Sequence, residues 1–140
     1  MKVVKNPVAV IDTNVLLVSI SSKSKYHWLY RSLIAGQFRL GITQDILLEY
    51  EEIIGAHWSA SVAKDVVRSI TELPNTSFVP VYYQLHLIAE DEDDNKFVDC
   101  AFAANAHCIV THDRHFQVLA EVDFPRIPVV DIHGFRALLE

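Results

Sequence analysis

Cysteine, glycine and proline are scarce in this chain. Its two cysteines, Cys100 and Cys108, stand in apolar stretches and have no metal-type spacing, which argues against a disulfide scaffold and predicts reduced, packed side chains. Four glycines and five prolines in 140 residues form no linker, repeat or low-complexity tract. We therefore expect residues 1–140 to fold as one domain.

Long apolar runs and an excess of positive charge are also missing. No window approaches the ~18–20 apolar residues of a membrane helix, and the amino terminus has no apolar region of signal-peptide length. These absences predict a cytoplasmic protein that does not enter the membrane. The net charge of −6 argues against nucleic-acid binding by the whole surface, because such binding depends on Lys and Arg meeting phosphates. A concentrated acidic site fits this charge better.

Short apolar runs alternate with stretches of helical periodicity, which predicts a mainly parallel sheet with helices on both faces. Gly36 and Gly55 are placed to end helices, Thr13 or Asn14 to begin one, and Pro80 favours an edge strand. The expected strands are 8–11, 38–43, 77–82, 107–111 and 128–132, and the expected helices are 15–20, 26–35, 44–54, 61–73, 94–106 and 133–139.

Carboxylates follow or flank several of these strands. Asp12 comes directly after the first strand and Asp113 after strand 107–111. Asp94 ends an acidic loop at the start of a helix, and Glu49 lies on the helix after the second strand. Because ligands of parallel α/β sheets bind at the carboxyl ends of the strands, we expect these four acids to converge in one crevice.

Crowded carboxylates call for a cation. Several bare carboxylates within a few ångströms repel one another, and hard ions such as Mg²⁺ or Mn²⁺ prefer carboxylate and water oxygens. The chain has no Ser/His/Asp spacing and no phosphate-cradling glycine loop, so the chemistry that suits the site is metal-assisted attack of water on a phosphodiester. Asp12 would be the central ligand, with Asp94 and Asp113 as partners and Glu49 as a ligand or an orienter of water.

Several neighbouring residues compete for these roles. Asp91 and Asp93 are alternatives to Asp94 as the third acid, and Asp99 is balanced between a ligand and a solvated helix position. A zinc site at His112 and His115 is disfavoured, because no cysteine or further histidine stands beside them. We interpret these two histidines as parts of a solvated turn.

Four motifs resemble the acidic motifs of the PIN-domain ribonucleases, with matching order, spacing and total length. The group that they resemble most comprises the toxins of type II toxin–antitoxin pairs. The motifs are Val-Ile-Asp-Thr-Asn-Val-Leu at 10–16, Thr-Gln-Asp-Ile-Leu-Leu-Glu-Tyr at 43–50, Asp-Asp-Asn-Lys-Phe-Val-Asp-Cys-Ala at 93–101 and Ile-Val-Thr-His-Asp at 109–113.

This resemblance implies a three-layer α/β/α domain that cleaves RNA with Mg²⁺ or Mn²⁺, forms a homodimer and is inhibited by a small antitoxin protein. Matched by position, the four acids are Asp12, Glu49, Asp94 and Asp113, and the supporting polar groups are Thr13, Asn14 and Thr111.

Contacts to RNA are predicted at basic residues near the acids. A basic and aromatic patch that includes Trp28 follows the first helix and suits phosphates and an unpaired base, although apolar packing also explains Trp28. The residues predicted to contact RNA are Lys23, Lys25, Arg31, Lys96 and Arg114.

Two other functions stay open: a binding module of the same fold that does not cut RNA, and an aspartyl phosphatase or phosphoacceptor domain.

Overall fold

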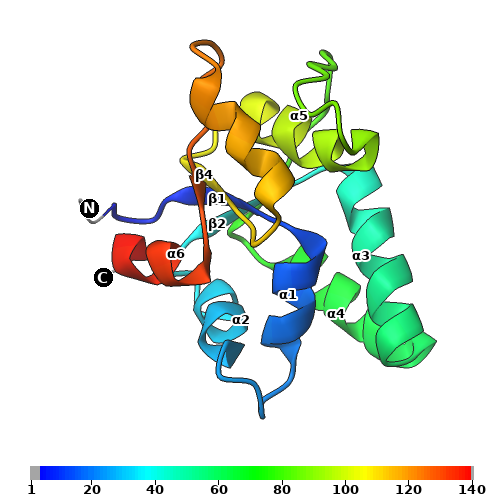
Figure 1. Ribbon diagram of the computed structural model, residues 1–140. Helices are drawn as coiled ribbons and strands as arrows, with labels where there is room; N and C mark the ends of the chain where they lie inside the picture. The colour runs from blue at the N-terminus through cyan, green and yellow to red at the C-terminus, as the bar shows by residue number, and fades with distance from the viewer. Residues whose placement is uncertain (1–3, 140) are drawn as a thin grey trace.

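One parallel sheet organises the computed structural model, which describes residues 4–139 (Figure 1). β1 lies at its centre, with Ala9 beside Leu40 of β2 and Val10 beside Ile109 of β4. The expected parallel sheet is therefore confirmed. The strands are β1 (Val8–Ile11), β2 (Arg39–Ile42), β3 (Thr76–Phe78), β4 (Cys108–Val110) and β5 (Val129–Val130), in the order β3-β2-β1-β4-β5.

Helices cover both faces of this sheet. The strand order reverses direction at β1, so right-handed crossovers place α1 to α4 on one face and α5 on the other. Figure 1 shows α5 on one side of the strands and α1, α2 and α6 on the other, which confirms the three-layer prediction. The helices are α1 (Thr13–Ile20), α2 (His27–Ile34), α3 (Gln44–His57), α4 (Ala60–Glu72), α5 (Asn95–Ala103) and α6 (Ile132–Leu139), with two 3₁₀ segments, η1 (Glu92–Asp94) and η2 (Arg114–Glu121).

The buried strands form a rigid frame. Residues 9–11, 40–42 and 108–110 are all buried, as expected for a parallel sheet covered on both faces. Gly41 of β2 allows α5 to approach closely, because a Cβ atom there would lie 3.2 Å from the Cβ of Ala104. Among the described residues, no helix has the length and apolar character needed to cross a membrane.

Three local predictions were wrong. Helix α3 does not end at Gly55 but continues to His57, because Gly55 lies against Ala63 where α3 and α4 pack together. Strand β3 ends at Phe78 instead of reaching residue 82, since Pro80 has no N–H to donate to the ladder. At α1 the N-cap is Asp12, not Thr13 or Asn14.

An irregular segment, residues 79–91, joins β3 to η1 and is tied to α5 by two buried side chains. The Asn95 amide donates to the carbonyl oxygen of Ile88 at 2.8 Å and accepts from its N–H at 2.9 Å. Asp99 accepts from the backbone N–H of Leu85 at 3.0 Å. These bonds replace the strand pairing that the segment lacks.

The end of β1 is also fixed from α3. Tyr50 is fully buried, and its hydroxyl donates to the carbonyl oxygen of Ile11, the residue before Asp12. Burial raises the pKa of Tyr50 well above 10, so the phenol remains a neutral donor. This bond links the helix that carries Glu49 to the strand that carries Asp12.

We predict that Tyr50→Phe lowers the free energy of unfolding by about 1–3 kcal/mol, because it leaves a buried carbonyl one partner short. Urea denaturation followed by circular dichroism measures the loss. Tyr82→Phe is the matched control, because Tyr82 is 82% exposed and its variant should unfold at the wild-type midpoint. Equal midpoints for both variants would contradict the structural role of the Tyr50 hydroxyl.

Candidate functional site

Asp12 and Thr111 join the carboxyl ends of the two central strands. Asp12 follows β1 and is 7% exposed, and its Oδ2 accepts a 2.7 Å hydrogen bond from the Thr111 hydroxyl. The backbone N–H of Asp12 donates to the carbonyl oxygen of Val110 at 3.0 Å. The Asp12 carboxylate is therefore held by Thr111, the residue after β4, and it forms no side-chain capping bond at the start of α1.

A tight turn places Asp113 beside Asp12. The Asp113 N–H donates to the Thr111 hydroxyl oxygen at 3.0 Å, and Asp113 Oδ1 accepts from the His115 N–H at 2.9 Å. Burial raises the pKa of Asp12, and the charges of Asp113 and Glu49 raise it further, while the Thr111 hydrogen bond opposes the shift. These three acids therefore share one electrostatic environment.

Glu49 enters this environment from α3 and has protein partners for both oxygens. The Thr13 hydroxyl donates to Oε2, and Lys96 Nζ lies 2.7 Å from Oε1. Lys96 also lies 2.9 Å from an oxygen of Asp93, which lowers the pKa of Asp93. One side of the cluster is thus neutralised by a lysine of the chain itself.

Asp94, at the start of α5, completes the cluster from the other side. Its pKa is raised to about 7, first by burial and then by the charges of Asp113, Asp91 and Asp12. Its Oδ2 atom is buried and has no hydrogen-bond partner among the described residues. The protein therefore leaves an oxygen of Asp94 without the partner that a buried carboxylate requires.

His115 was not predicted as part of this cluster. It does not lie in a solvated turn: its side chain is 28% exposed, and its Nδ1 lies 3.6 Å from Asp94 Oδ2. Ligand atoms of Asp91, Asp94 and His115 all lie within 4.8 Å of one another. Its neighbour His112 is exposed, as expected.

Asp99 lies apart from these acids. It is 7% exposed, so it is not the solvated helix position that was one of the two expectations. Its carboxylate holds the N–H of Leu85, and the charged groups that act on its pKa are His86 and Glu92 rather than members of the cluster. The structure therefore places Asp99 in the anchoring of segment 79–91.

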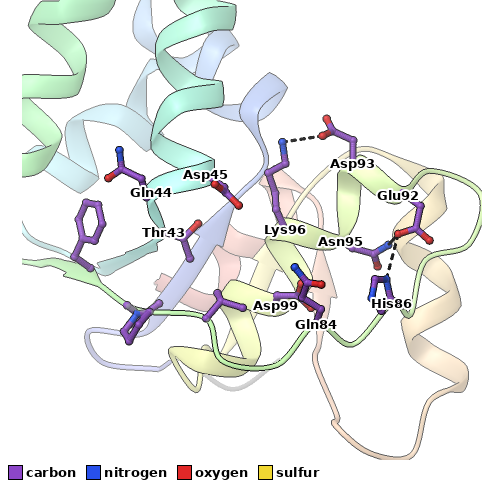
Figure 2. A pocket seen from close by; sticks show the side chains of 14 residues that line it. Thr43, Gln44, Asp45, Gln84, His86, Glu92, Asp93, Asn95, Lys96 and Asp99 are labelled. Atoms are coloured by element: carbon purple, nitrogen blue, oxygen red, sulfur yellow. Dashed lines mark hydrogen bonds and ion pairs between the residues drawn. The ribbon is translucent and has the colours of Figure 1, made fainter.

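A pocket of about 700 Å³ adjoins the cluster at Lys96 (Figure 2). Figure 2 shows Lys96 paired with Asp93 on one wall, near Asp45 and Thr43, while Asn95 and His86 lie beside Glu92. The rest of the lining comes from Gln44, Gln84, Asp99 and the chain from Phe78 to Val81. The pocket thus lies between the start of α3, α5 and the irregular segment.

The other predicted residues have different positions. Asn14, Lys23, Arg31 and Arg114 are exposed, and Arg114 directly follows Asp113. The Lys25 ammonium lies 5.1 Å from the centre of the Tyr26 ring. That ring in turn packs beside His112 with centroids 6.3 Å apart, so Lys25 is linked to the turn that carries Asp113.

The donor set fits a hard divalent cation. The carboxylates of Asp12, Asp94 and Asp113 influence one another at one edge of the sheet: burial first, and then the charges of Asp113, Asp91 and Asp12, raise the pKa of Asp94. Oxygen ligands of this kind suit Mg²⁺ and Mn²⁺. The Oδ2 atom of Asp94 makes no hydrogen bond with the described residues, so it is able to accept such an ion.

Comparison with known proteins identifies the family of this fold. A family model of the PIN domain matches residues 8–115, from β1 to the turn after β4. The chain belongs to the PIN-domain family. No curated protein is similar enough in sequence to match it.

Two solved structures share the PIN fold of this chain. VapBC2 from Rickettsia felis, bound to a DNA fragment from its promoter, has a TM-score of 0.60 and 15% identity over 89% of this chain and 98% of the other. VapBC-1 from nontypeable Haemophilus influenzae has a TM-score of 0.56 and 16% identity over 90% of this chain and 98% of the other. At these identities the likeness establishes the fold alone.

The raised pKa of Asp94 predicts how the stability of the metal-free PIN domain depends on pH. The folded state keeps a proton on Asp94 up to about pH 7, whereas the unfolded chain loses it near the ordinary value of 3.8. The stability that this proton contributes is complete below about pH 4 and is lost as the pH rises to about 7. Relative to Asp94→Asn, the wild type should therefore lose thermal stability between pH 5 and pH 8.

Thermal unfolding in a chelating buffer measures this difference, and added Mg²⁺ or Mn²⁺ should restore the wild type at pH 8. Asp93→Asn is the matched control, because the lowered pKa of Asp93 confines its effect to pH values below about 4. A wild-type to Asp94→Asn difference that does not change with pH would contradict the assignment.

Proposed function

We propose that this PIN domain, residues 1–140, is a divalent-metal-dependent endoribonuclease. The observation that carries the proposal is the electrostatic crowding of Asp12, Asp94 and Asp113 at one sheet edge, where burial and the charges of neighbouring carboxylates raise the pKa of Asp94 to about 7. Carboxylates crowded in this way are suited to holding Mg²⁺ or Mn²⁺. The bound cation would activate a water molecule and neutralise charge that develops on the phosphate.

The side chains around the proposed metal site would orient its ligands, the attacking water and the RNA phosphate. Thr111 orients Asp12 through the hydroxyl bond to Oδ2, and the turn at Asp113 fixes the neighbouring carboxylate. Glu49 is held by Thr13 and Lys96, so we assign it to orienting the attacking water. Lys96 stands between the cluster and the pocket, where its charge can meet an RNA phosphate.

A basic rim supports RNA as the substrate. Lys25, Tyr26 and His112 form a connected set beside Asp113, and this mixture of positive charge and ring faces suits a flexible single strand. The net charge of −6 restricts attraction for phosphate to such local groups. We therefore propose single-stranded RNA as the substrate, with Lys23, Arg31 and Arg114 as outer phosphate contacts.

Membership of the PIN-domain family also suggests protein partners for this chain. Two solved PIN structures with this fold come from VapBC complexes, and the sequence motifs resemble those of type II toxins. We propose that the chain is such a toxin, that it forms a homodimer and that a small antitoxin protein inhibits it. An adjacent reading frame for a small DNA-binding protein would separate a toxin from a housekeeping nuclease.

Loss of Asp12 should abolish cleavage while the fold persists. Removing a group that only orients a metal ligand typically costs about 10–100-fold, so Asp12→Asn is expected to cost more than about 100-fold in rate. Thermal stability should stay equal or rise, because burial and neighbouring charges disfavour the ionised Asp12 that the variant removes. Cleavage of a labelled single-stranded RNA with Mn²⁺, with and without chelator, measures the rate.

Asp65→Asn is the matched control for this experiment, since Asp65 is an exposed acid of α4 that does not line the pocket beside Lys96, and it should cleave like the wild type. Cleavage by Asp12→Asn at the wild-type rate, or in excess chelator, would refute the mechanism. A wild type that binds metal but cuts no RNA would instead favour the binding module.

The basic rim predicts a salt-dependent binding defect in Lys25→Ala. Each phosphate contact to a single strand contributes about 0.7 to the slope of log affinity against log salt concentration, so the slope should become shallower by about that amount. Fluorescence anisotropy in the Asp12→Asn background measures binding without cleavage. Lys64→Ala, which removes an exposed lysine of α4, should retain the wild-type slope, and an unchanged slope in Lys25→Ala would remove Lys25 from the RNA path.

A further inference from the structure

His115 is held between two groups of carboxylates. Its Nε2 lies 3.1 Å from Glu90 Oε2 at the end of segment 79–91. On the other side of the ring, Nδ1 lies 3.3 Å from Asp113 Oδ1 and 3.6 Å from Asp94 Oδ2. The imidazole therefore spans the space between the irregular segment and the acidic cluster.

The two ring nitrogens have different surroundings. Nε2 lies within ion-pair distance of Glu90, at 3.1 Å from Oε2, whereas Nδ1 is buried and makes no hydrogen bond with the described residues. The Asp113 oxygen nearest to Nδ1 already accepts the backbone N–H of His115 itself. A purely structural ion pair would aim an Nδ1–H at a carboxylate, and the geometry lacks that bond.

A histidine that binds a metal is usually arranged in this way. Its distal N–H donates to a carboxylate, which fixes the tautomer and leaves the lone pair of the other nitrogen facing the ion. Here Glu90, 3.1 Å from Nε2, is in the place of that carboxylate, and Nδ1 makes no hydrogen bond with the described residues. Nδ1 faces the equally unpartnered Oδ2 of Asp94, and a ligand atom of Asp91 completes a group within 4.8 Å.

We propose that His115 Nδ1, with Asp94 and Asp91, binds a divalent cation and selects Mn²⁺ or a later first-row transition ion over Mg²⁺. The inference deepens the proposed function, because Asp94 belongs to the same nuclease site. Mg²⁺ demands oxygen ligands in near-ideal octahedral geometry, whereas imidazole nitrogen suits transition ions. Replacing one oxygen ligand by nitrogen thus shifts the preference away from Mg²⁺.

Mn²⁺ binding to the full chain tests the proposal without reference to cleavage. Electron spin echo spectroscopy detects ¹⁴N coupled to bound Mn²⁺, and a titration against free Mn²⁺ gives the affinity. Mg²⁺ competition then gives the ratio of the two affinities. We expect a ¹⁴N signal in the wild type and an affinity for Mn²⁺ well above that for Mg²⁺.

Two variants of His115 sharpen the result. In His115→Ala the ¹⁴N signal should vanish and the Mn²⁺ affinity should fall about tenfold or more, with a smaller change for Mg²⁺. In His115→Asp, an all-oxygen set, binding should persist while the ¹⁴N signal and the preference for Mn²⁺ are lost. His57→Ala is the matched control, because His57 is an exposed histidine at the end of α3, and it should behave as the wild type.

The outcomes separate this proposal from the nuclease itself. Absence of ¹⁴N coupling in the wild type, its persistence in both His115 variants, or an equal loss of affinity for both ions overturns the role of His115. Mn²⁺-dependent RNA cleavage without ¹⁴N coupling would leave the nuclease standing and refute this inference. If His115→Asp removes a ¹⁴N signal that the wild type shows, but the wild type cuts no RNA, the role of His115 in metal binding stands and the nuclease proposal is refuted.

Discussion

The hydrogen bond from Thr111 holds the buried Asp12 carboxylate in place although the neighbouring carboxylates of Asp113 and Glu49 repel it. Both residues follow strands whose side chains are fully packed, so the frame can resist the crowding. The Tyr50 hydroxyl adds a second restraint at Ile11, from the helix that brings Glu49. The position of Asp12 is therefore set by buried apolar strands and by neutral hydroxyl groups rather than by contacts among the acids.

The acids around this bond are not equivalent. On one side Lys96 pairs with Glu49 and Asp93, and it lowers the pKa of Asp93. On the other side the ion pair of Asp94 within residues 4–139 is with His115 rather than with a lysine or arginine, and the pKa of Asp94 is raised to about 7. The protein neutralises one half of the cluster itself and leaves the other half short of positive charge. An external cation would be drawn to that second half, where His115 lies.

Much of this site could be predicted from the sequence, because Asp12 and Asp113 follow apolar runs and the ends of parallel strands share one edge. The choice of Asp94 over Asp91 and Asp93 rested on the spacing of the motif at 93–101. His115 could not be predicted, since its environment is created by segment 79–91, which has no periodic pattern and lies far from it in sequence. Asp99 was misread for a similar reason: its partner is a backbone N–H fourteen residues earlier.

The acidic loop and the first turns of α5 therefore combine two roles that a count of carboxylates cannot separate. Asp94 faces the cluster, whereas Asn95 and Asp99 bind the backbone of Ile88 and Leu85 and so anchor the irregular segment. Glu90 lies only two residues after Ile88, so this anchoring also fixes the carboxylate that contacts His115. Through this anchoring, Asn95 and Asp99 of α5 help to position Glu90 and therefore His115. Segment 79–91, which has no helix or strand, therefore links the packing of α5 to the surroundings of His115 in the acidic cluster.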